Sequence, residues 1–208
     1  MILIGQFDSP FVRRVGIAMT LYEMAFEHRP WSVFGDGEQI ATYNPLRRVP
    51  TLVLGDGTAL IESATILLHL DEEAGPERAL IAERGETRRD HLRLSALAMG
   101  LCDKLVALIY ERALHETVSE VWTQRCEAQV ADVLAVLEAE RSKVQAAYLF
   151  GETPGHADIA LACAFRFLTD AHPVIQARDE WPALAAHMAA CETVPAFSAI
   201  SQPFIPPA

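Results

Sequence analysis

The first residue that could do chemistry is Ser9, which precedes Pro10 in the stretch DSPFVRRVGIAM at residues 8–19. The two residues stand where a short apolar run gives way to a helical pattern, and serine followed by proline is a favourable helix start. Taken alone, Ser9 is therefore expected to cap the helix. The alternative is that its hydroxyl points at a substrate, beside a helix N-terminus that favours negative charge.

A second candidate is the Val49-Pro50 pair in NPLRRVPTLVL, residues 44–54, directly before a strand pattern. A proline at the start of a strand is ordinary, because proline cannot donate to a β-ladder. The bond could also be cis, which would turn the Val49 backbone outward for an extended peptide to pair with. This alternative gains weight only if a ligand anchor lies nearby.

The stretch IESATILLHL at residues 61–70 supplies such an anchor, because Glu62 and Ser63 stand where a strand ends and a helix begins. The free N–H groups of that helix and the Ser63 hydroxyl could bind a carboxylate, while Glu62 could pair with an ammonium group. An ordinary helix cap explains the two residues equally well. Together with Ser9, however, they predict a slot for a short peptide with an α-amino acid head.

The elements that must position these residues form an α/β pattern over residues 1–76, in the order β-α-β, a short helix or loop, then β-β-α. Strands are expected at residues 2–5, 27–33 and in a hairpin at 51–62, with helices after Pro10 and from Ser63 to Gly75.

Strand patterns stop after a hinge at residues 75–83, and residues 84–208 are expected to form an all-helical domain. Its helices are predicted at residues 84–115, 118–148, 156–169 and 182–191, followed by an extended proline-containing tail. The apolar stripes of the first two helices include Leu92 and Val121.

Composition limits the possible partners. The formal net charge of −11 argues against nucleic acid and anionic membranes, and no apolar run approaches the ~20 residues that span a bilayer. The four cysteines are widely spaced, which favours buried, reduced thiols in a cytoplasmic protein. The seven histidines show no metal-ligand spacing, and the arginine pairs at 13–14 and 88–89 are expected on solvated faces.

Four stretches, SPFVRRVGIAM, NPLRRVPTLVL, LIESATILLHL and ADIALA at residues 157–162, resemble the cytosolic glutathione transferase family. The serine-type tau-like, zeta-like and bacterial members are the most similar, and the omega class has cysteine in place of Ser9. The resemblance implies a thioredoxin-like domain at residues 1–76 that binds glutathione. It also implies a helical domain at residues 84–208 that helps form the pocket for a second substrate.

The resemblance assigns a role to Ser9 and Phe11. Ser9 matches the catalytic serine that hydrogen-bonds the glutathione sulfur, and Phe11 matches an aromatic residue near the sulfur, although a core position explains Phe11 equally well. Redox members of the thioredoxin superfold have CxxC here, whereas this chain has SPFV. Dithiol exchange by its own sulfurs is therefore excluded at this position, and the thiol must come from the ligand.

The remaining matches concern glutathione binding. Val49, before a presumed cis Pro50, matches the residue whose backbone pairs with the cysteinyl part of glutathione. Glu62 and Ser63 match the pair that holds the γ-glutamyl end, and Arg48 falls near the basic position that meets the glycyl carboxylate. Glutathione is thus implied as co-substrate, and no metal is implied.

Three residues of the second half are expected to be structural. Asp158 resembles the acidic member of a helix capping box whose first position is Gly155 here, which makes it a folding motif. Asp103 and Tyr110 lie seven residues apart on the long helix and could face the cleft. A solvated aspartate and a packed tyrosine are the simpler interpretations.

The family implies an enzyme that activates the glutathione thiol for attack on a small, partly apolar electrophile. An isomerisation or a dehalogenation would use the same activated thiol. A homodimer is also implied. The alternative from another class is a non-catalytic binding or regulatory protein of the same fold.

Overall fold

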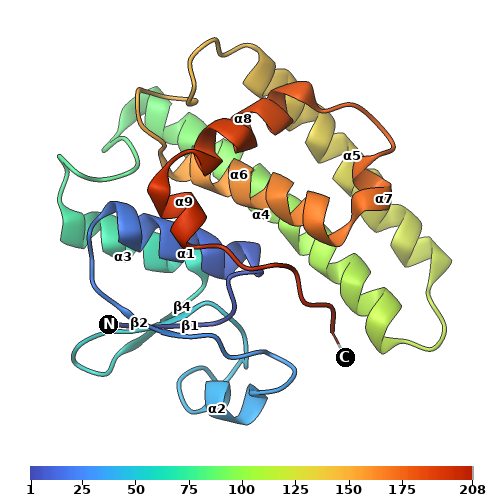
Figure 1. The fold of residues 1–208 in the computed structure, drawn as a ribbon, viewed down its shortest axis with the longest axis horizontal. Coiled ribbons are helices and arrows are strands. Elements are labelled where there is room, and N and C mark those ends of the chain that lie inside the picture. Colours follow the sequence, from blue (N-terminus) through green and yellow to red (C-terminus); the bar gives the residue numbers. More distant parts are fainter. Residues whose placement is uncertain (208) are drawn as a thin grey trace.

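The N-terminal part of the chain folds around a four-stranded sheet in the order β2-β1-β3-β4 (Figure 1). The computed structural model describes residues 1–207. β2 runs parallel to β1, whereas β3 is antiparallel to both β1 and β4. The elements are β1 (Ile2–Ile4), α1 (Pro10–Leu21), β2 (Glu27–Arg29), α2 (Gly37–Ala41), β3 (Thr51–Val53), β4 (Ala59–Ile61) and α3 (Ser63–Ala74).

The sheet separates two apolar layers, because successive strand residues point to opposite faces. Leu3 and Leu52 pack into the cluster formed with α1 and α3. Ile4 and Val53 pack instead with Ile40 of α2. The sheet is therefore covered on both faces at its central strands, which explains why β1 and β3 are short apolar runs, whereas the edge strand β2 (Glu27–Arg29) is polar.

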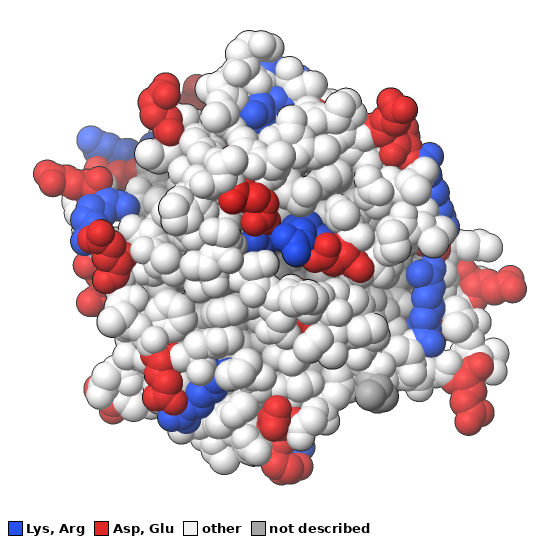
Figure 2. All heavy atoms as spheres, viewed as in Figure 1, with Lys and Arg blue, Asp and Glu red and all other residues white. Residues whose placement is uncertain are grey.

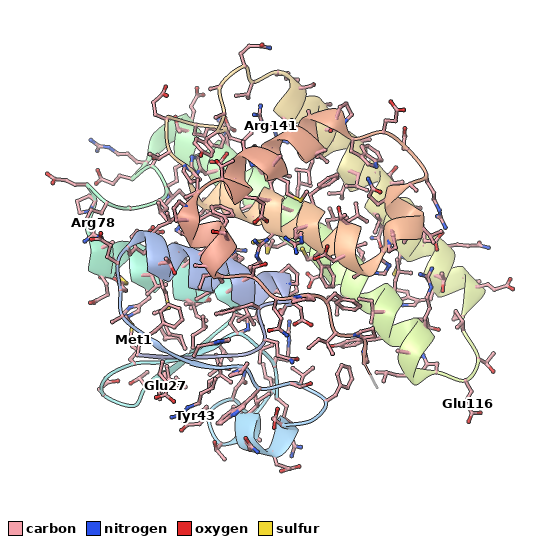
Figure 3. All side chains as sticks on the ribbon, viewed as in Figure 1. Met1, Glu27, Tyr43, Arg78, Glu116 and Arg141 are labelled. Atoms are coloured by element: carbon pink, nitrogen blue, oxygen red, sulfur yellow. The ribbon has the colours of Figure 1, made fainter. Side chains whose placement is uncertain are left out.

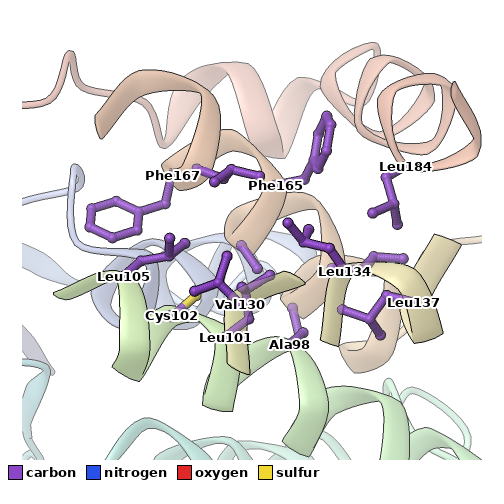
Figure 4. Close-up of a cluster of buried hydrophobic side chains, with 14 of the residues drawn as sticks. Ala98, Leu101, Cys102, Leu105, Val130, Leu134, Leu137, Phe165, Phe167 and Leu184 are labelled. Carbon is purple, nitrogen blue, oxygen red and sulfur yellow. The ribbon is translucent and has the colours of Figure 1, made fainter. Parts of the chain in front are cut away.

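The rest of the chain is helical, and its core lies between α4, α5 and α6 (Figure 4). Leu101 and Leu105 of α4, Val130 and Leu134 of α5 and Phe165 of α6 are all buried there. The elements are α4 (Gly85–Leu114), α5 (Glu120–Ser142), α6 (His156–Ala171), α7 (Pro173–Gln176), α8 (Pro182–Glu192) and α9 (Pro195–Ala199). The expected fold class, an α/β domain followed by an all-helical domain, is confirmed.

Three details of the helical prediction are wrong. The second long helix ends at Ser142 instead of continuing to residue 148, and α7 and α9 are additional short helices. Val121 is 80% exposed and Leu92 is 48% exposed. Helix geometry turns both away from the buried stripes of their helices, since Val121 stands five residues before buried Cys126 and Leu92 two before buried Leu94.

The segment between the two domains is fixed by hydrogen bonds and is not a free hinge. The Leu80 amide donates to the Tyr22 hydroxyl oxygen at 3.0 Å and to Asp71 Oδ1 at 3.1 Å. His156, the first residue of α6, bonds through Nε2 to Asp71 at 2.9 Å, and its amide donates to the Leu80 carbonyl at 2.9 Å. Arg78, which stands at the rim beside α3 in Figure 3, donates to the Tyr22 carbonyl.

The expectation that the 13–14 arginine pair is solvated is wrong, because Arg13 and Arg14 are each only 4% exposed. The helical domain packs over their face of α1. Arg13 Nε donates to the Ile200 carbonyl at 2.8 Å, while Nη2 donates to the Phe197 carbonyl at 3.0 Å and to Glu192 at 2.8 Å. Burial lowers the pKa of Arg14 to about 10.

Charged side chains are dispersed on the face drawn in Figure 2, where lysines and arginines stand among acidic residues.

Asp158, expected to be part of a helix capping motif, is fully buried. It accepts hydrogen bonds from the Gly155 amide at 2.9 Å and from the Leu149 amide at 2.7 Å. Within residues 1–207, none of the helices is long and apolar enough to cross a membrane.

Candidate functional site

A cavity of about 680 Å³ lies between the sheet domain, the helical domain and the C-terminal tail. The sheet domain contributes the loop that carries Ser9, the segment from Trp31 to Gly35 and the Arg47–Val49 turn. α4 contributes Asp103 and Tyr110. The tail follows α9 past the start of α1 (Figure 1) and closes the remaining side.

Ser9 stands at the N-cap position of α1 with an extended backbone, φ −68° and ψ 121°. Its carbonyl accepts the first helical bond from the Arg13 amide at 2.9 Å, but its side chain makes no capping hydrogen bond. The expectation that the hydroxyl caps the helix is therefore wrong. Ser9 is half-buried and lines the cavity, together with Pro10, the first residue of α1.

Val49 lines the cavity, and the peptide bond between Val49 and Pro50 is cis. Asn44 is buried beneath this turn and donates from Nδ2 to the Arg48 carbonyl at 2.9 Å. Gly5, at φ +127°, lets the end of β1 pass close to the turn, since a Cβ there would lie 2.8 Å from Val49 Cβ. The turn is thus held from below by an amide and from the side by backbone contact.

Glu62 precedes α3 in the left-handed region, at φ +66°. A glutamate held there is uncommon, and such positions concentrate at functional sites. Its carboxylate is half-exposed and lies 3.1 Å from Arg48 Nη1, while Ser63 is buried as the first residue of α3. Neither Glu62, Ser63 nor Pro50 lines the cavity itself, so the Arg48–Glu62 pair marks its outer edge.

The opposite wall is aromatic. The Phe34 ring meets Tyr110 edge-on at 5.4 Å, which joins the β2–α2 segment to α4 across the cavity. The Phe167 ring meets Phe204 of the tail in the same way at 5.8 Å. Phe11 both lines the cavity and packs against the helical core, so its two interpretations hold together.

Asp103 and Tyr110 both line the cavity, which corrects the expectation of a solvated aspartate and a packed tyrosine. Burial raises the pKa of Asp103, and Arg48 from the facing domain opposes that rise. Burial likewise raises the pKa of the Tyr110 phenol. Helix periodicity places residues seven apart on one face of α4, and the structure shows that this face meets the cleft.

Sequence reasoning missed the residues on the far side of the cavity. Trp31 and Phe34 stand in the β2–α2 segment, and Phe204 and Ile205 stand in the tail. A local signal did exist, since large apolar residues in segments without a core-facing period require either burial by another part of the chain or a ligand.

Comparison with known proteins assigns the chain to a family. Residues 3–78 match the profile described as glutathione S-transferase, N-terminal domain, and residues 120–190 match glutathione S-transferase, C-terminal domain. The chain belongs to the glutathione S-transferase family. The resemblance inferred from the motifs is therefore confirmed.

Individual glutathione S-transferase relatives agree. The chain is similar to the uncharacterized GST-like protein YibF of Escherichia coli (strain K12), at 28% identity over 169 residues, covering 80% of this chain and 81% of YibF. A glutathione S-transferase from Methylobacterium radiotolerans, in complex with glutathione sulfonate, has TM-score 0.88 and 25% identity, covering 100% of this chain and 98% of that one. One from Methylobacillus flagellatus with GSH bound has TM-score 0.88 and 26% identity, covering 98% and 99%.

Within residues 1–207, no group of three or more histidine, cysteine or acidic side chains gathers as a metal site. All four cysteines are free and buried, and burial raises the pKa of Cys163 to about 11. These thiols are protonated at neutral pH, so none of them supplies a nucleophile to the cavity. The cavity therefore offers one hydroxyl beside a helix N-terminus and a pair of opposite charges at its edge.

Proposed function

We propose that this protein is a glutathione transferase that activates the thiol of glutathione with Ser9 for attack on a small, partly apolar electrophile. The observation that carries the proposal is the Ser9 hydroxyl, which stands at the N-terminus of α1 without a capping bond and lines the cavity. A serine needed only as a cap would accept a hydrogen bond from a backbone N–H of the first helical turn with its hydroxyl oxygen.

The proposed pose of glutathione follows the charges of the site. The γ-glutamyl head lies at the start of α3, with its ammonium group against Glu62 and its carboxylate at the helix N–H groups and Ser63. The cysteinyl part pairs with the backbone of Val49, before cis Pro50, and Arg48 meets the glycyl carboxylate. The related structures that hold glutathione or its sulfonate support glutathione as the ligand.

The chemistry needs a thiolate. A free cysteine thiol has a pKa of about 8.5, and a hydrogen bond from Ser9 together with the positive end of α1 favours the charged form, so the thiol releases its proton to water. The thiolate sulfur then forms a bond to the electrophilic carbon. The bond from that carbon to the leaving group breaks and the leaving group takes the electron pair. Phe11 and the aromatic wall hold the apolar part of the electrophile next to the sulfur.

The proposal includes a division of labour and a setting. Residues 1–76 bind glutathione and residues 84–208 contribute the second-substrate side. The four free, buried thiols favour a reducing compartment such as the cytoplasm. A homodimer is proposed from the family, and light scattering at two protein concentrations tests it.

Calorimetric titration with glutathione tests the proposal. The wild type is expected to bind, and Glu62→Gln is expected to weaken binding by about 10-fold or more, because an ion pair with the ammonium is lost. The control is Glu38→Gln, which removes another exposed glutamate–arginine pair of the same domain. No binding by the wild type at millimolar glutathione would refute the proposal.

Turnover separates the remaining alternatives. Binding without turnover across aryl halides, epoxides, peroxides and maleyl compounds would favour a non-catalytic glutathione-binding protein. Turnover confined to maleyl compounds would indicate a double-bond isomerase, and release of halide from alkyl halides would indicate a dehalogenase. Each of these uses the same thiol at the same place.

A further inference from the structure

We propose that Asp8 and Gln202 are positioning residues, which lock the C-terminal segment 201–207 onto the loop that carries Ser9. The second-substrate wall and the thiol-activating hydroxyl are then set by one hydrogen-bonded unit. This inference deepens the proposed function and rests on it where catalysis is concerned. Its structural part, the lock itself, stands on the contacts below.

The first contact of the lock is made by Asp8, the residue directly before Ser9. Asp8 Oδ2 accepts the backbone amide of Ile205 at 3.0 Å, across 197 residues of chain. Both residues line the cavity. A carboxylate that accepts a backbone N–H makes one of the stronger neutral-to-charged bonds, so Asp8 holds the tail at the point where the tail meets the cavity.

The second contact lies on the other side of the same loop. Gln202 Oε1 accepts the Phe7 amide at 3.1 Å, across 195 residues. Phe7 is itself fixed by a parallel stack on His28 with ring centroids 3.8 Å apart, and His28 Nε2 bonds the Gly5 carbonyl at 2.8 Å. The loop from β1 to Ser9 is therefore tied to β2 through His28 and to the tail through Gln202.

The residues just before the tail are fixed to α1, the helix that begins after Ser9. Arg13, one turn after Ser9, donates to the Ile200 and Phe197 carbonyls, at 2.8 Å and 3.0 Å. The extended segment 201–207 thus runs beside the β1–α1 loop from a buried anchor, bonded at Gln202 and again at Ile205. It forms no helix or strand of its own, so these side chains set its path.

The consequence is coupling. Phe204 packs edge-on against Phe167, and Phe204 and Ile205 form part of the cavity wall. The apolar part of a second substrate bound against these two residues would contact the segment that Asp8 and Gln202 hold in place. Because these two contacts are made at Phe7 and Asp8, the residues directly before Ser9, the position of its hydroxyl depends on the tail.

The test uses the full-length protein and four variants. Asp8→Ala and Gln202→Ala each remove one contact, their double variant removes both, and Asp8→Asn retains an oxygen that can accept the Ile205 amide. The control is Asp56→Ala, which removes an aspartate that also accepts a backbone amide, that of Thr58 at 2.8 Å, in the β3–β4 turn. Thermal unfolding checks that every variant is folded.

Hydrogen exchange tests the lock without any ligand. In the double variant, exchange of peptides covering residues 5–12 and 201–207 is expected to rise by about 10-fold or more, because two hydrogen bonds are lost. Asp8→Asn and Asp56→Ala should leave both peptides near the wild-type rate. Unchanged exchange of residues 5–12 in the double variant would overturn the inference.

Ligands test the coupling to function. S-hexylglutathione carries a hexyl chain that glutathione lacks. The Kd for glutathione divided by the Kd for S-hexylglutathione therefore measures how strongly the second-substrate wall binds that chain. The double variant is expected to reduce that ratio by about 3- to 10-fold, to raise KM for an aryl halide and to lower kcat, with glutathione affinity retained. Asp8→Asn should restore most of the ratio.

The outcomes separate the two proposals. If the wild type binds neither ligand, the proposed function fails and the exchange experiment alone decides the lock. If the wild type binds both and the double variant keeps the wild-type ratio, KM and kcat, the inference fails while the proposed function stands.

Discussion

The two walls of the cavity are built in different ways. The sheet-domain wall carries Ser9 at the start of α1, Arg48 and Val49 in the turn before β3, and Glu62 between β4 and α3. The facing wall is made of aromatic and aliphatic side chains from α4, α6 and the tail, and Phe34 of the β2–α2 segment joins it through its contact with Tyr110. The sheet-domain wall, called here the polar wall, offers hydrogen-bond partners and charges, whereas the facing wall, called the apolar wall, offers apolar surface.

This difference teaches how one cavity can serve two kinds of ligand. Strand ends, a cis X-Pro turn and helix N-termini present backbone groups and charges at fixed places, which suits a ligand of constant chemistry. Apolar side chains contributed by distant segments give shape with little directionality, which suits a variable one. The predictions below disturb the helical domain, the polar wall or the apolar wall in turn.

The largest expected effect concerns the stability in acid of the helical domain, which carries most of the apolar wall. Four buried histidines, His91, His156, His172 and His187, all belong to the helical domain, and burial lowers the pKa of each. Below their ordinary value of 6.5 the unfolded chain takes up protons that the folded chain refuses, so stability falls with pH down to the folded value, about 4 for His187.

His187 shows the cause. Its ring is fully buried, and its Nδ1 accepts a hydrogen bond from Arg141 Nε at 2.9 Å, so a proton there would face a guanidinium. Its neutral form contributes about 3 kcal/mol that is lost between pH 6.5 and about 4. Urea unfolding at successive pH values measures this. His187→Gln should flatten the curve and exposed His115→Gln should not; equal curves in both would contradict the prediction.

The next effect breaks the polar wall at one atom. Ser9→Ala is expected to lower kcat by about 100-fold, since one positioned donor to the thiolate is lost. Glutathione affinity should change by less than about twofold, because the hydroxyl acts on the sulfur's charge state. Steady-state kinetics and calorimetry check this. Ser32→Ala removes another cavity-lining serine of the same domain and should leave kcat unchanged; a similar loss there would assign the activation elsewhere.

A smaller effect breaks the apolar wall. Phe34→Ala removes the edge-on contact with Tyr110 that closes the cavity, and the KM for an aryl electrophile is expected to rise by about 5- to 10-fold. Glutathione affinity should stay at the wild-type value. The control is Leu46→Ala, which truncates an apolar side chain of the same domain that is 57% exposed and outside the cavity. A matching loss of glutathione affinity would show that the walls are not separate.

The same contrast explains what the sequence could predict. The sheet-domain features were readable because each depends on adjacent residues, as in Val49-Pro50 or Glu62-Ser63. Their contacts were not readable, as the pairing of Arg48 with Glu62 and the bare Ser9 hydroxyl show. Both are set by how the chain folds back on itself.

The facing wall depends on contacts across the whole chain, so local patterns described it poorly. Asp103 and Tyr110 were correctly placed on one helix face, but nothing local said that this face meets the cavity. The burial of Arg13 and Arg14 was missed because it comes from the helical domain, which packs on α1. Residues 201–207 looked like a plain tail until the folded chain brought Ile205 to Asp8.

The smallest expected effect concerns Asp103, an acidic residue on the apolar wall that lies across the cavity from Arg48. Asp103 lines the cavity, and Arg48 across it is the first influence that opposes the rise of its pKa. Asp103→Asn removes a negative charge while keeping the size of the side chain. An electrophile bearing a carboxylate should therefore gain in kcat/KM by about 2- to 5-fold, in line with a half-exposed charge interaction of roughly 1 kcal/mol or less.

A neutral electrophile of the same shape serves as the internal reference, and its kcat/KM should stay constant. Asp132→Asn, on the exposed side of α5, changes the net charge of the protein equally and controls for long-range attraction. Raising the salt concentration should shrink the gain in Asp103→Asn, because partly exposed charges are screened. If Asp132→Asn gives the same gain, the effect belongs to the net charge, and the apolar wall selects its ligand by shape alone.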